Sequence, residues 1–385
     1  MNLKGKKLMV MCGTALSCEI VEVAKKMGVY TMVTDYIPNS PAKKIADESF
    51  DVSTTDIDAM VSLCKEKKVD GIFTNFIDSM LPYCLEICKH LNKPFYLNEE
   101  QIKVFGEKKN FKKACIESGV AVPQEFKMTE DFKENDFKKI IYPVIVKPVD
   151  SSGSKGISVC YSETELKNAF KHALEYSKSK NVVVEKYFTG DEVTVNYIMQ
   201  DGEVMLTSIH DRYFNTEQVD VLKTPDVYIY PSKYVKEYLK STNLKVIKML
   251  KKWGFKDGSI FLQACVENNE FYFYEAGIRL NGCKIYQLVD AESDYNALKH
   301  MICYALTGSM GKPDIKEKIN PIFKNWYATL SILSNPGVIG KIDGINEIKE
   351  MPEVVGVTPW YWEGDEIKNE YRGTLLQTII RVSLK

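Results

Sequence analysis

The segment KPVDSSGSKGIS, residues 147–158, places a lysine at the end of an apolar run and a Ser/Gly-rich loop soon after it. Glycines permit positive φ angles and close approach of a ligand, and successive backbone N–H groups with serine hydroxyls can surround an anion. Lys147 ends the run YPVIVK, so a strand would hold its charge in place. Two interpretations stay open, a polyphosphate site and a surface hairpin turn. The loop residues concerned are Ser151, Ser152, Gly153, Ser154 and Gly156.

A second segment, VVVEKYFTGDE at residues 182–192, combines a run of valines with two glutamates. Glu185 follows the valines directly, and Glu192 lies seven residues further on. A carboxylate and exposed backbone at the end of a buried strand can recognise an adenine amino group, and a second carboxylate can accept from ribose hydroxyls. Because acidic residues are common on protein surfaces, a solvated acidic turn is the alternative.

The third segment, residues 261–282, carries an amide, a carboxylate and a guanidinium. Gln263 and Glu275 lie on the two arms of a predicted hairpin, and opposed arms can place both side chains on one face. A carboxylate beside an amide oxygen suits Mg²⁺ carried on substrate phosphates. Arg279 follows by four residues and could hold a carboxylate or a transferring phosphoryl group. A charged Glu275 among aromatic residues would be costly without a partner, which favours a functional site.

The elements that position these segments follow from hydrophobic periodicity. Strands alternate with helices at the start of the chain, which indicates a parallel sheet with helical crossovers. Two helices are predicted over 99–123, ending at Gly119, and a small α+β unit with antiparallel strands begins at 126. The strands expected before them are 6–13, 30–36 and 71–76, and the helices are 18–28, 57–70 and 79–91.

The second half of the chain is dominated by hairpin patterns. Residues 193–210 are expected to turn at Asp201-Gly202, and residues 259–277 at Asn268-Asn269. Further strand patterns occur at 338–344 and 354–362. The turn CGTALS at 12–17 lacks the G-x-G-x-x-G spacing, although Asp35 follows the next strand. A tight strand-to-helix turn is therefore favoured there over a dinucleotide site.

Composition excludes several classes of function. The chain has 385 residues, 45% of them hydrophobic and 27% charged, which suits a globular protein of two to four subdomains. Lys plus Arg is 51 against 52 for Asp plus Glu, so nonspecific nucleic-acid binding has no basic excess to rest on. No uncharged apolar window of membrane-spanning length occurs. The ten cysteines form no CxxC pair and several stand in apolar segments, which predicts reduced thiols and a cytoplasmic protein.

The three segments, in this order after a βαβ start, resemble the ATP-grasp superfamily over essentially the whole chain. The nearest branch is the carboxylase-like one, with biotin carboxylase, carbamoyl phosphate synthetase, purine-pathway ligases and L-amino-acid ligases. The resemblance implies an α/β and α+β fold in three parts. These are an N-terminal Rossmann-like domain at 1–98, an ATP-grasp domain at 99–310 whose residues 126–188 form a mobile lid, and a small C-terminal closing domain at 311–385.

The resemblance also implies roles for single residues. Segment 106–123 is similar to the branch's lysine motif, which places its lysine at Lys108, eleven residues before Gly119. The implied nucleotide ligands are Lys108, Lys147, the loop residues Ser151, Ser152, Gly153, Ser154 and Gly156, then Glu185, Lys186, Phe188 and Glu192. The implied metal ligands are Gln263 and Glu275, and the implied catalytic residues are Arg279, Lys147 and Lys108.

One position departs from the family pattern. The family usually reads Glu-x-Asn-x-Arg, whereas this chain reads Glu275-Ala-Gly277-Ile-Arg279. The usual asparagine metal ligand is lost, and Asn281 is a candidate to replace it. This departure puts the metal set, and to a lesser extent activity, in question.

The implied reaction uses ATP and Mg²⁺, with Mn²⁺ as the alternative metal. The γ-phosphoryl group passes to a substrate carboxylate, and an amine then displaces phosphate from the acyl phosphate. His210 is a candidate general base, although a hydrogen-bonded strand-end histidine is favoured. Residues 212–232 are rich in tyrosine and poor in arginine, which favours a small amino acid or carboxylic acid as acceptor.

Two alternative functions stay open at this stage. One is a purine-pathway ligase such as phosphoribosylglycinamide synthetase, and the other is an ATP-binding module that has lost catalysis, with Gly277 as its mark. The expected partners are ATP and small carboxylate and amine substrates, without nucleic acid or membrane. A homodimer is expected by analogy with the family alone.

Overall fold

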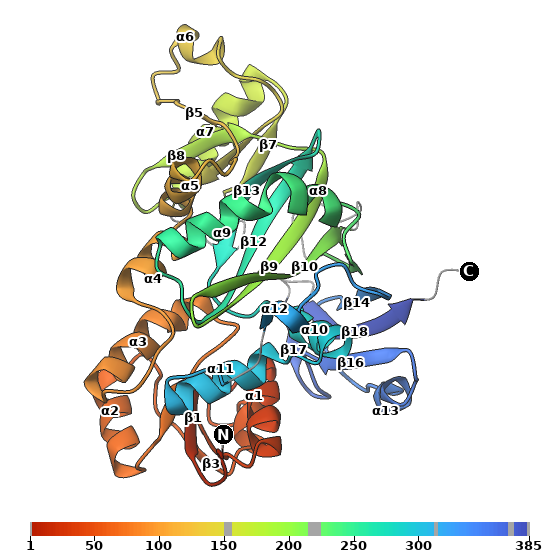
Figure 1. Cartoon of the computed structure of the whole chain (residues 1–385). Helices are drawn as coiled ribbons and strands as arrows, with labels where there is room; N and C mark the ends of the chain where they lie inside the picture. The colour runs from red at the N-terminus through yellow and green to blue at the C-terminus, as the bar shows by residue number, and fades with distance from the viewer. Residues whose placement is uncertain (1, 150–155, 215–224, 312–314, 369–372, 383–385) are drawn as a thin grey trace.

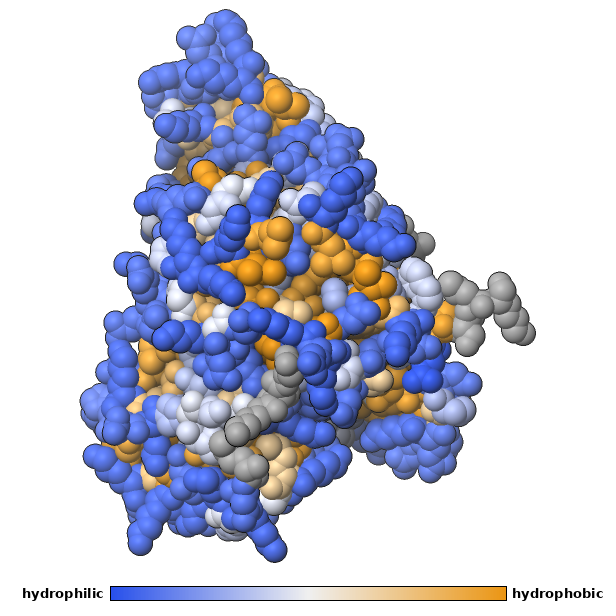
Figure 2. Space-filling view, viewed as in Figure 1, coloured by the Kyte–Doolittle hydropathy of each residue, from blue (hydrophilic) through white to orange (hydrophobic). Residues whose placement is uncertain are grey.

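The computed structural model describes residues 2–149, 156–214, 225–311, 315–368 and 373–382. It contains an N-terminal parallel sheet, a small antiparallel sheet at the opposite end of the molecule, and a large sheet between them (Figure 1). Hydrophobic side chains gather near the middle of the face in Figure 2, and the small sheet's end is mostly hydrophilic. The predicted combination of a parallel α/β unit with α+β units is confirmed.

The N-terminal sheet has the strand order β3-β2-β1-β4, and all its pairs are parallel. The three strands β2, β1 and β4 are almost entirely buried, as expected where helices cross over between parallel strands, whereas the edge strand β3 is partly exposed. Thr14 caps the first helix with its side chain, so that helix begins before the predicted residue 18. The elements are β1 (Lys7–Met11), α1 (Ala15–Lys26), β2 (Tyr30–Thr34), η1 (Pro41–Lys44), β3 (Glu48–Phe50), α2 (Ile57–Glu66), β4 (Gly71–Phe73), η2 (Asp78–Met80) and α3 (Leu81–His90).

Two helices, α4 (Glu99–Gly106) and α5 (Lys108–Glu117), lead from this unit to the small sheet. Asn98 and Gln101 form a capping box at the start of α4, and Gly119 takes φ 68° after α5. The predicted pair of helices ending at this glycine is confirmed. The small sheet has the order β5-β8-β6-β7, and every pair in it is antiparallel. Its elements are β5 (Glu125–Phe126), α6 (Glu134–Phe137), β6 (Val144–Pro148), β7 (Ser158–Cys160), α7 (Glu163–Tyr176) and β8 (Val182–Lys186).

The large sheet has eight strands in the order β13-β12-β9-β10-β11-β14-β18-β16. Both predicted hairpins are confirmed. Asp201 and Gly202 have φ angles of 50° and 81°, and Asn268 and Asn269 have 53° and 62°, as two-residue hairpin turns require. The elements are β9 (Asp191–Gln200), β10 (Glu203–Tyr213), β11 (Val227–Tyr230), α8 (Val235–Ser241), α9 (Asn243–Lys252), β12 (Gly258–Glu267) and β13 (Glu270–Gly277).

The C-terminal strands extend the large sheet, because β11 pairs with β14 and β18 follows. The strand predicted at 338–344 is wrong for most of its length: β15 is only Gly337–Val338, which pairs with β17 in a separate two-stranded sheet, and residues 340–344 form no strand. Ile339 adds backbone hydrogen bonds to Asp365 and Gly364 beyond β15. The elements are α10 (Ile285–Ser293), α11 (Ala297–Thr307), α12 (Ile315–Lys318), β14 (Trp326–Ser334), β15 (Gly337–Val338), α13 (Ile345–Lys349), β16 (Val354–Pro359), β17 (Glu366–Ile367) and β18 (Gly373–Val382).

The predicted domain boundaries at 98/99 and 310/311, and the mobility of a lid at 126–188, stay proposals. Within the described ranges, no helix is both long and apolar enough to cross a membrane.

Candidate active site

One face of the large sheet, here called the polar face, carries many polar and charged side chains. Residues that stand opposite one another in antiparallel strands share a face, as do residues two apart in one strand. The other face packs on α8 and α9, where the Tyr197 hydroxyl bonds to Tyr238 and Asn243. The register places on the polar face Glu192, Thr194 and Asn196 of β9, Ser208, His210 and Arg212 of β10, Tyr228 of β11, Phe261, Gln263 and Cys265 of β12, and Glu275 and Gly277 of β13.

The two predicted metal ligands stand directly opposite each other in this register. Gln263 pairs with Glu275, and both side chains are partly exposed on the polar face. The Lys108 ammonium lies 3.9 Å from the Glu275 carboxylate. A carboxylate and an amide oxygen at one point suit Mg²⁺, so the residues present fit the metal that the resemblance implies. Across the described part of the chain, no group of three or more His, Cys, Asp or Glu residues adds a further metal cluster.

Gly277, which departs from the family pattern, has a packing reason. The Phe261 ring stands opposite it, and a Cβ atom at position 277 would lie 2.3 Å from two ring carbons. The same ring has the Arg279 guanidinium 5.1 Å from its centre. Asn281, the candidate replacement ligand, is buried and accepts a hydrogen bond from the Cys283 N–H (3.0 Å). Phe261 therefore occupies space that an asparagine side chain would need.

Replacing Gly277 by asparagine should therefore destabilise the protein rather than restore a ligand. We expect Gly277→Asn to lower the free energy of unfolding by about 1–3 kcal/mol, because the new side chain must displace a buried ring. In a Phe261→Ala background the same substitution should cost much less. Denaturant unfolding of the two single variants and the double variant measures this coupling. Additive losses in the double variant would contradict it.

The two lysines predicted to bind phosphate come from separate elements. Lys108 opens α5, and Lys147 lies in β6. The Lys147 ammonium donates to the Glu185 carboxylate of β8 at 2.8 Å. Lys112, one helical turn after Lys108, donates to the other oxygen of the same carboxylate. Glu185, predicted as part of an adenine site, thus has its side chain held between two lysines.

Burial dominates the acid–base behaviour of these lysines. Desolvation, with repulsion from Lys112 and Lys108, lowers the pKa of Lys147 to about 7. Desolvation also lowers the pKa of Lys112 to about 8. The hydrogen bonds to Glu185 oppose this shift by stabilising the ammonium forms. A further anion beside Lys147 would stabilise its ammonium form and raise its pKa.

This lowered pKa predicts that MgATP binding takes up protons. Above pH 7 part of the free protein has neutral Lys147, whereas a phosphate beside it stabilises the ammonium and raises its pKa. Affinity for MgATP should therefore fall as pH rises from about 7 to 9. Calorimetry in buffers of different ionisation enthalpy should show proton uptake at pH 8 that the Lys147→Met variant lacks. Equal uptake in that variant would contradict the assignment.

Glu192, the predicted ribose ligand, belongs to a three-residue network. Its Oε2 accepts from Arg212 at 2.8 Å and from the Tyr274 hydroxyl at 2.9 Å, and Arg212 also donates to that hydroxyl at 2.7 Å. Arg212 is almost fully buried, so Glu192 neutralises a desolvated cation. Glu192 remains about one-third exposed and could still accept from a ligand.

The other predicted nucleotide residues have mixed surroundings. The Lys186 N–H donates to the Gln124 carbonyl at 2.9 Å, so this N–H would have to break that hydrogen bond to bind adenine. The Phe188 ring stacks on Tyr272 with centroids 4.4 Å apart. Gly156 takes φ 73°, in the region that favours glycine. Ser151, Ser152, Gly153 and Ser154 lie outside the described residues.

Residues of the N-terminal unit form hydrogen bonds with three successive residues, 278–280, in the loop after β13. The Tyr96 hydroxyl donates to the Ile278 carbonyl at 3.0 Å, and the Leu280 N–H donates to the Asn75 side chain at 3.1 Å. Between them, Arg279 donates from Nε and Nη2 to one oxygen of Asp78, at 2.9 and 2.6 Å. Arg279 is thereby fixed at the boundary between the large sheet and the N-terminal unit.

The surroundings of His210 and of the turn at 12–17 do not favour the functional roles considered for them from the sequence. His210 is fully buried, its Nε2 has no hydrogen-bond partner among the described residues, and burial lowers its pKa well below the usual range. It therefore stays a neutral side chain inside the sheet. The turn at 12–17 uses Asp35 internally, because the Gly13 N–H donates to its carboxylate at 2.6 Å. A Cβ atom at Gly13 would lie 2.0 Å from the Ser40 hydroxyl. Both observations favour the tight turn over a dinucleotide site.

Several site residues were missed from the sequence. Lys112 could have been found, because it lies four residues after Lys108 and shares its helix face. Arg212 follows His210 by two positions on a strand, which also puts both on one face. The contacts from Asn75, Asp78 and Tyr96 have no local signal. They join residues about 200 positions apart in the chain.

Comparisons with known proteins agree with this geometry. Residues 118–253 match the family described as "D-ala D-ala ligase C-terminus", and residues 8–93 match the "PylC-like, N-terminal domain". Formate-dependent phosphoribosylglycinamide formyltransferase of Sulfurisphaera tokodaii is 25% identical over 362 residues, covering 91% of this chain and 86% of that protein.

Solved structures resemble the whole chain. Phosphoribosylglycinamide synthetase from Anaerococcus prevotii has a TM-score of 0.77 at 21% identity, covering 98% of this chain and 94% of that one. L-amino acid ligase from Bacillus licheniformis has 0.76 at 20%, covering 98% and 93%. A biotin carboxylase domain dimer of Hydrogenobacter thermophilus 2-oxoglutarate carboxylase, in complex with MgADP, ADP and bicarbonate, has 0.75 at 18%, covering 98% and 86%. At these identities the structures establish a shared fold.

Proposed function

We propose a function on the premise that the chain belongs to the carboxylase-like branch of the ATP-grasp superfamily. It is an ATP-dependent carboxylate–amine ligase that produces ADP and phosphate. The acceptor we propose is a small amino acid or carboxylic acid. The observation that carries the proposal is the direct opposition of Gln263 and Glu275, with Lys108 3.9 Å from Glu275.

The reaction we propose has two steps, a phosphoryl transfer and a displacement of phosphate by the amine. A carboxylate oxygen of the acceptor forms a bond to the γ-phosphorus of ATP, and the bond to the bridging oxygen breaks as ADP leaves. The amine nitrogen then bonds to the acyl carbon, the carbon–oxygen bond to phosphate breaks, and the amine gives up a proton. Phosphoryl transfer depends chiefly on positioning and charge neutralisation.

Each residue of the site has a separate role in this proposed reaction. Lys108 and Lys147 neutralise the phosphates, and Glu275 with Gln263 would hold Mg²⁺, which neutralises further phosphate charge when bound. Arg279, fixed by Asp78 and flanked by Phe261, would stabilise the charge that develops on the acceptor carboxylate. Glu192 would accept from the ribose. We also propose that residues 126–188 close over ATP.

A further observation supports a small zwitterionic acceptor. Three cations near the polar face already have carboxylate partners: Arg212 with Glu192, Arg279 with Asp78, and Lys284 with Glu19. A phosphate monoester carries up to two negative charges and would have to break such a pair. An amino acid brings no net charge and can interact with both members of the Arg279–Asp78 pair.

The purine-pathway alternative has its own support. Two of the similar proteins are named for phosphoribosylglycinamide chemistry, and each match spans most of both chains. Loss of catalysis remains the third candidate, favoured by the packing at Gly277. We also propose a cytoplasmic protein, supported by ten free cysteines, and a homodimer by analogy with a similar dimeric structure.

The testing experiment is ADP release from the purified protein with MgATP. Separate pools of amino acids, small carboxylates, and phosphoribosylamine with glycine serve as acceptors, and the Glu275→Ala variant runs alongside. Turnover with the amino-acid pool that is lost in the variant is the expected result. Turnover only with phosphoribosylamine and glycine would favour the purine alternative. ATP binding without turnover in any pool would favour the inactive module.

A further inference from the structure

A buried cluster of one carboxylate and two lysines connects α5 to the small sheet. Glu185 is 2% exposed, Lys112 9% and Lys147 16%, and each lysine donates to its own oxygen of the carboxylate. A buried carboxylate is tolerated when it is paired, and either lysine alone would neutralise it. When both lysines are protonated, the cluster therefore has one positive charge in excess.

The excess charge matters because Lys147 has a second task under the proposed function. Its ammonium donates to Glu185, whereas phosphate binding requires it to turn toward the nucleotide. If Lys147 were the sole partner, that movement would leave an uncompensated carboxylate in a dry environment. Such a group is strongly unfavourable, and the loss would appear as weaker nucleotide affinity.

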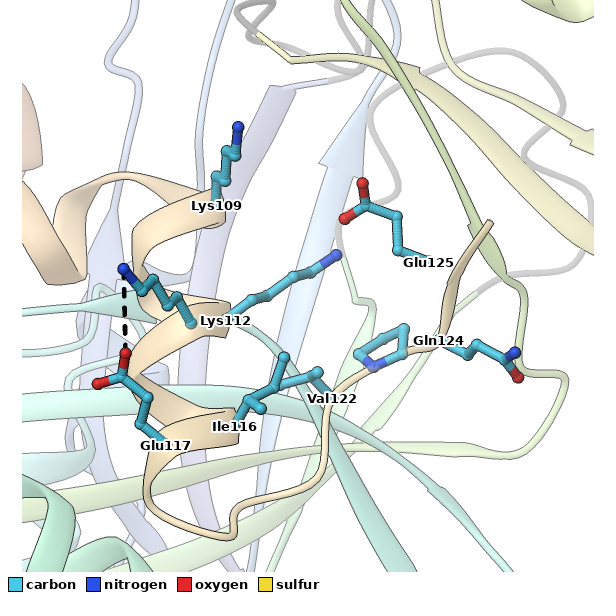
Figure 3. A pocket seen from close by; sticks show the side chains of 9 residues that line it. Lys109, Lys112, Ile116, Glu117, Val122, Gln124 and Glu125 are labelled. Carbon is cyan, nitrogen blue, oxygen red and sulfur yellow. Dashed lines mark ion pairs between the residues drawn. The ribbon is translucent and has the colours of Figure 1, made fainter. Parts of the chain in front are cut away.

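Lys112 is placed to remain with Glu185 when Lys147 leaves. It projects from α5 across a pocket of about 460 Å³ between that helix and the segment 122–125 (Figure 3). Lys109 and Lys113 border the same pocket from the exposed side of the helix, and Lys113 lies 4.0 Å from Glu117. Of these three lysines, Lys112 alone is buried.

Resting on the proposed ATP-dependent function, we propose that Lys112 is a positioning residue: it keeps Glu185 paired so that Lys147 can exchange this carboxylate for a phosphate of ATP. Lys112 then acts through Glu185 and need not touch the nucleotide. The charged and titratable groups that face the two lysines are Glu185, Glu125, Glu275, Lys108, Cys115 and Cys265.

Calorimetric measurement of MgATP affinity tests this role. Lys112→Met should weaken binding by about 10- to 100-fold, and Lys112→Arg should retain most of the affinity because it restores the charge. Lys113→Met is the matched control, since it removes the same charge from the same helix at a 78% exposed side chain. Its affinity should stay within about twofold of the wild type.

A second substitution separates positioning from direct phosphate binding. Adding Glu185→Gln to Lys112→Met removes the carboxylate that would lose its last partner when Lys147 turns to the nucleotide. The affinity of the double variant for MgATP should therefore lie within about threefold of that of Glu185→Gln alone. The same comparison can be made if Lys112→Met alone does not fold, because the double variant lacks the buried carboxylate that would depend on Lys147 alone. No recovery, or wild-type affinity in Lys112→Met, would overturn the inference.

The outcomes also distinguish this inference from the function on which it rests. Wild-type protein that binds no MgATP would overturn both. Wild-type protein that binds MgATP and turns over an acceptor, with Lys112→Met unchanged in affinity, would overturn the role of Lys112 and leave the ligase function standing.

Discussion

Replacing Arg279 by methionine is expected to lower kcat by about 10²–10³-fold, because a fixed charge at the reacting group contributes mainly in the transition state. Affinity for MgATP should stay within about twofold, since Lys108 and Lys147 supply the phosphate contacts. The fold should persist, because the partner Asp78 is about half exposed and can be solvated. Steady-state kinetics with the acceptor found by ADP release, together with calorimetry, measure the two effects separately.

Asp78→Asn is the matched control for this prediction. It keeps Arg279 and one hydrogen-bond acceptor while removing the ion pair, so kcat should fall only a few-fold. If Arg279→Met retained more than a third of the wild-type kcat, the acceptor role of Arg279 would be wrong. If it lost MgATP affinity instead, Arg279 would belong to the nucleotide site.

The Glu275→Ala substitution is expected to reduce turnover by at least about 10³-fold, because it removes the only carboxylate of the proposed metal pair and leaves the amide of Gln263. The apparent affinity for Mg²⁺ should weaken in the same variant. Stability should change little, since the carboxylate is partly exposed and its ion pair with Lys108 is long at 3.9 Å.

Glu270→Ala provides the comparison on the same strand. Glu270 is exposed near the hairpin turn and bonds to the Tyr272 hydroxyl, away from the proposed metal pair. Its turnover and Mg²⁺ dependence should match the wild type. Equal losses in the two variants would mean that the strand's fold, and not a metal ligand, explains the effect of Glu275→Ala.

Local features of the fold and site could be predicted from the sequence. The turn at Asn268-Asn269 fixes the register of its hairpin as far as the Ala264–Phe273 pair. A bulge between Gln263 and Ala264, which the turn does not encode, then shifts the register by one residue and puts Gln263 opposite Glu275. The helix pair ending at Gly119 has similar local signals. Lys147 could be placed on a strand because YPVIVK is apolar and β-branched. These inferences needed only neighbouring residues and the period of a strand or helix.

Contacts between distant segments could not be predicted in this way. The Arg279–Asp78 pair joins residues 201 positions apart, and the Lys112–Glu185 pair joins residues 73 apart. No periodicity links such residues; the fold brings them together. The same limit applies to the C-terminal strands, whose addition to the large sheet through β11 depends on a pairing that no turn encodes. The packing of Phe261 on Gly277 also appears only in three dimensions.

The most direct test of the proposed acyl phosphate intermediate is whether an oxygen of the acceptor's carboxylate appears in the released phosphate. A pool of amino acids labelled with ¹⁸O in their carboxylates is incubated with MgATP and the protein, and the released phosphate is analysed by mass. An acyl phosphate intermediate moves one carboxylate oxygen into each phosphate, so label should appear in step with ADP. ADP release that depends on the pool but yields unlabelled phosphate would contradict the account, because water would then be the phosphoryl acceptor.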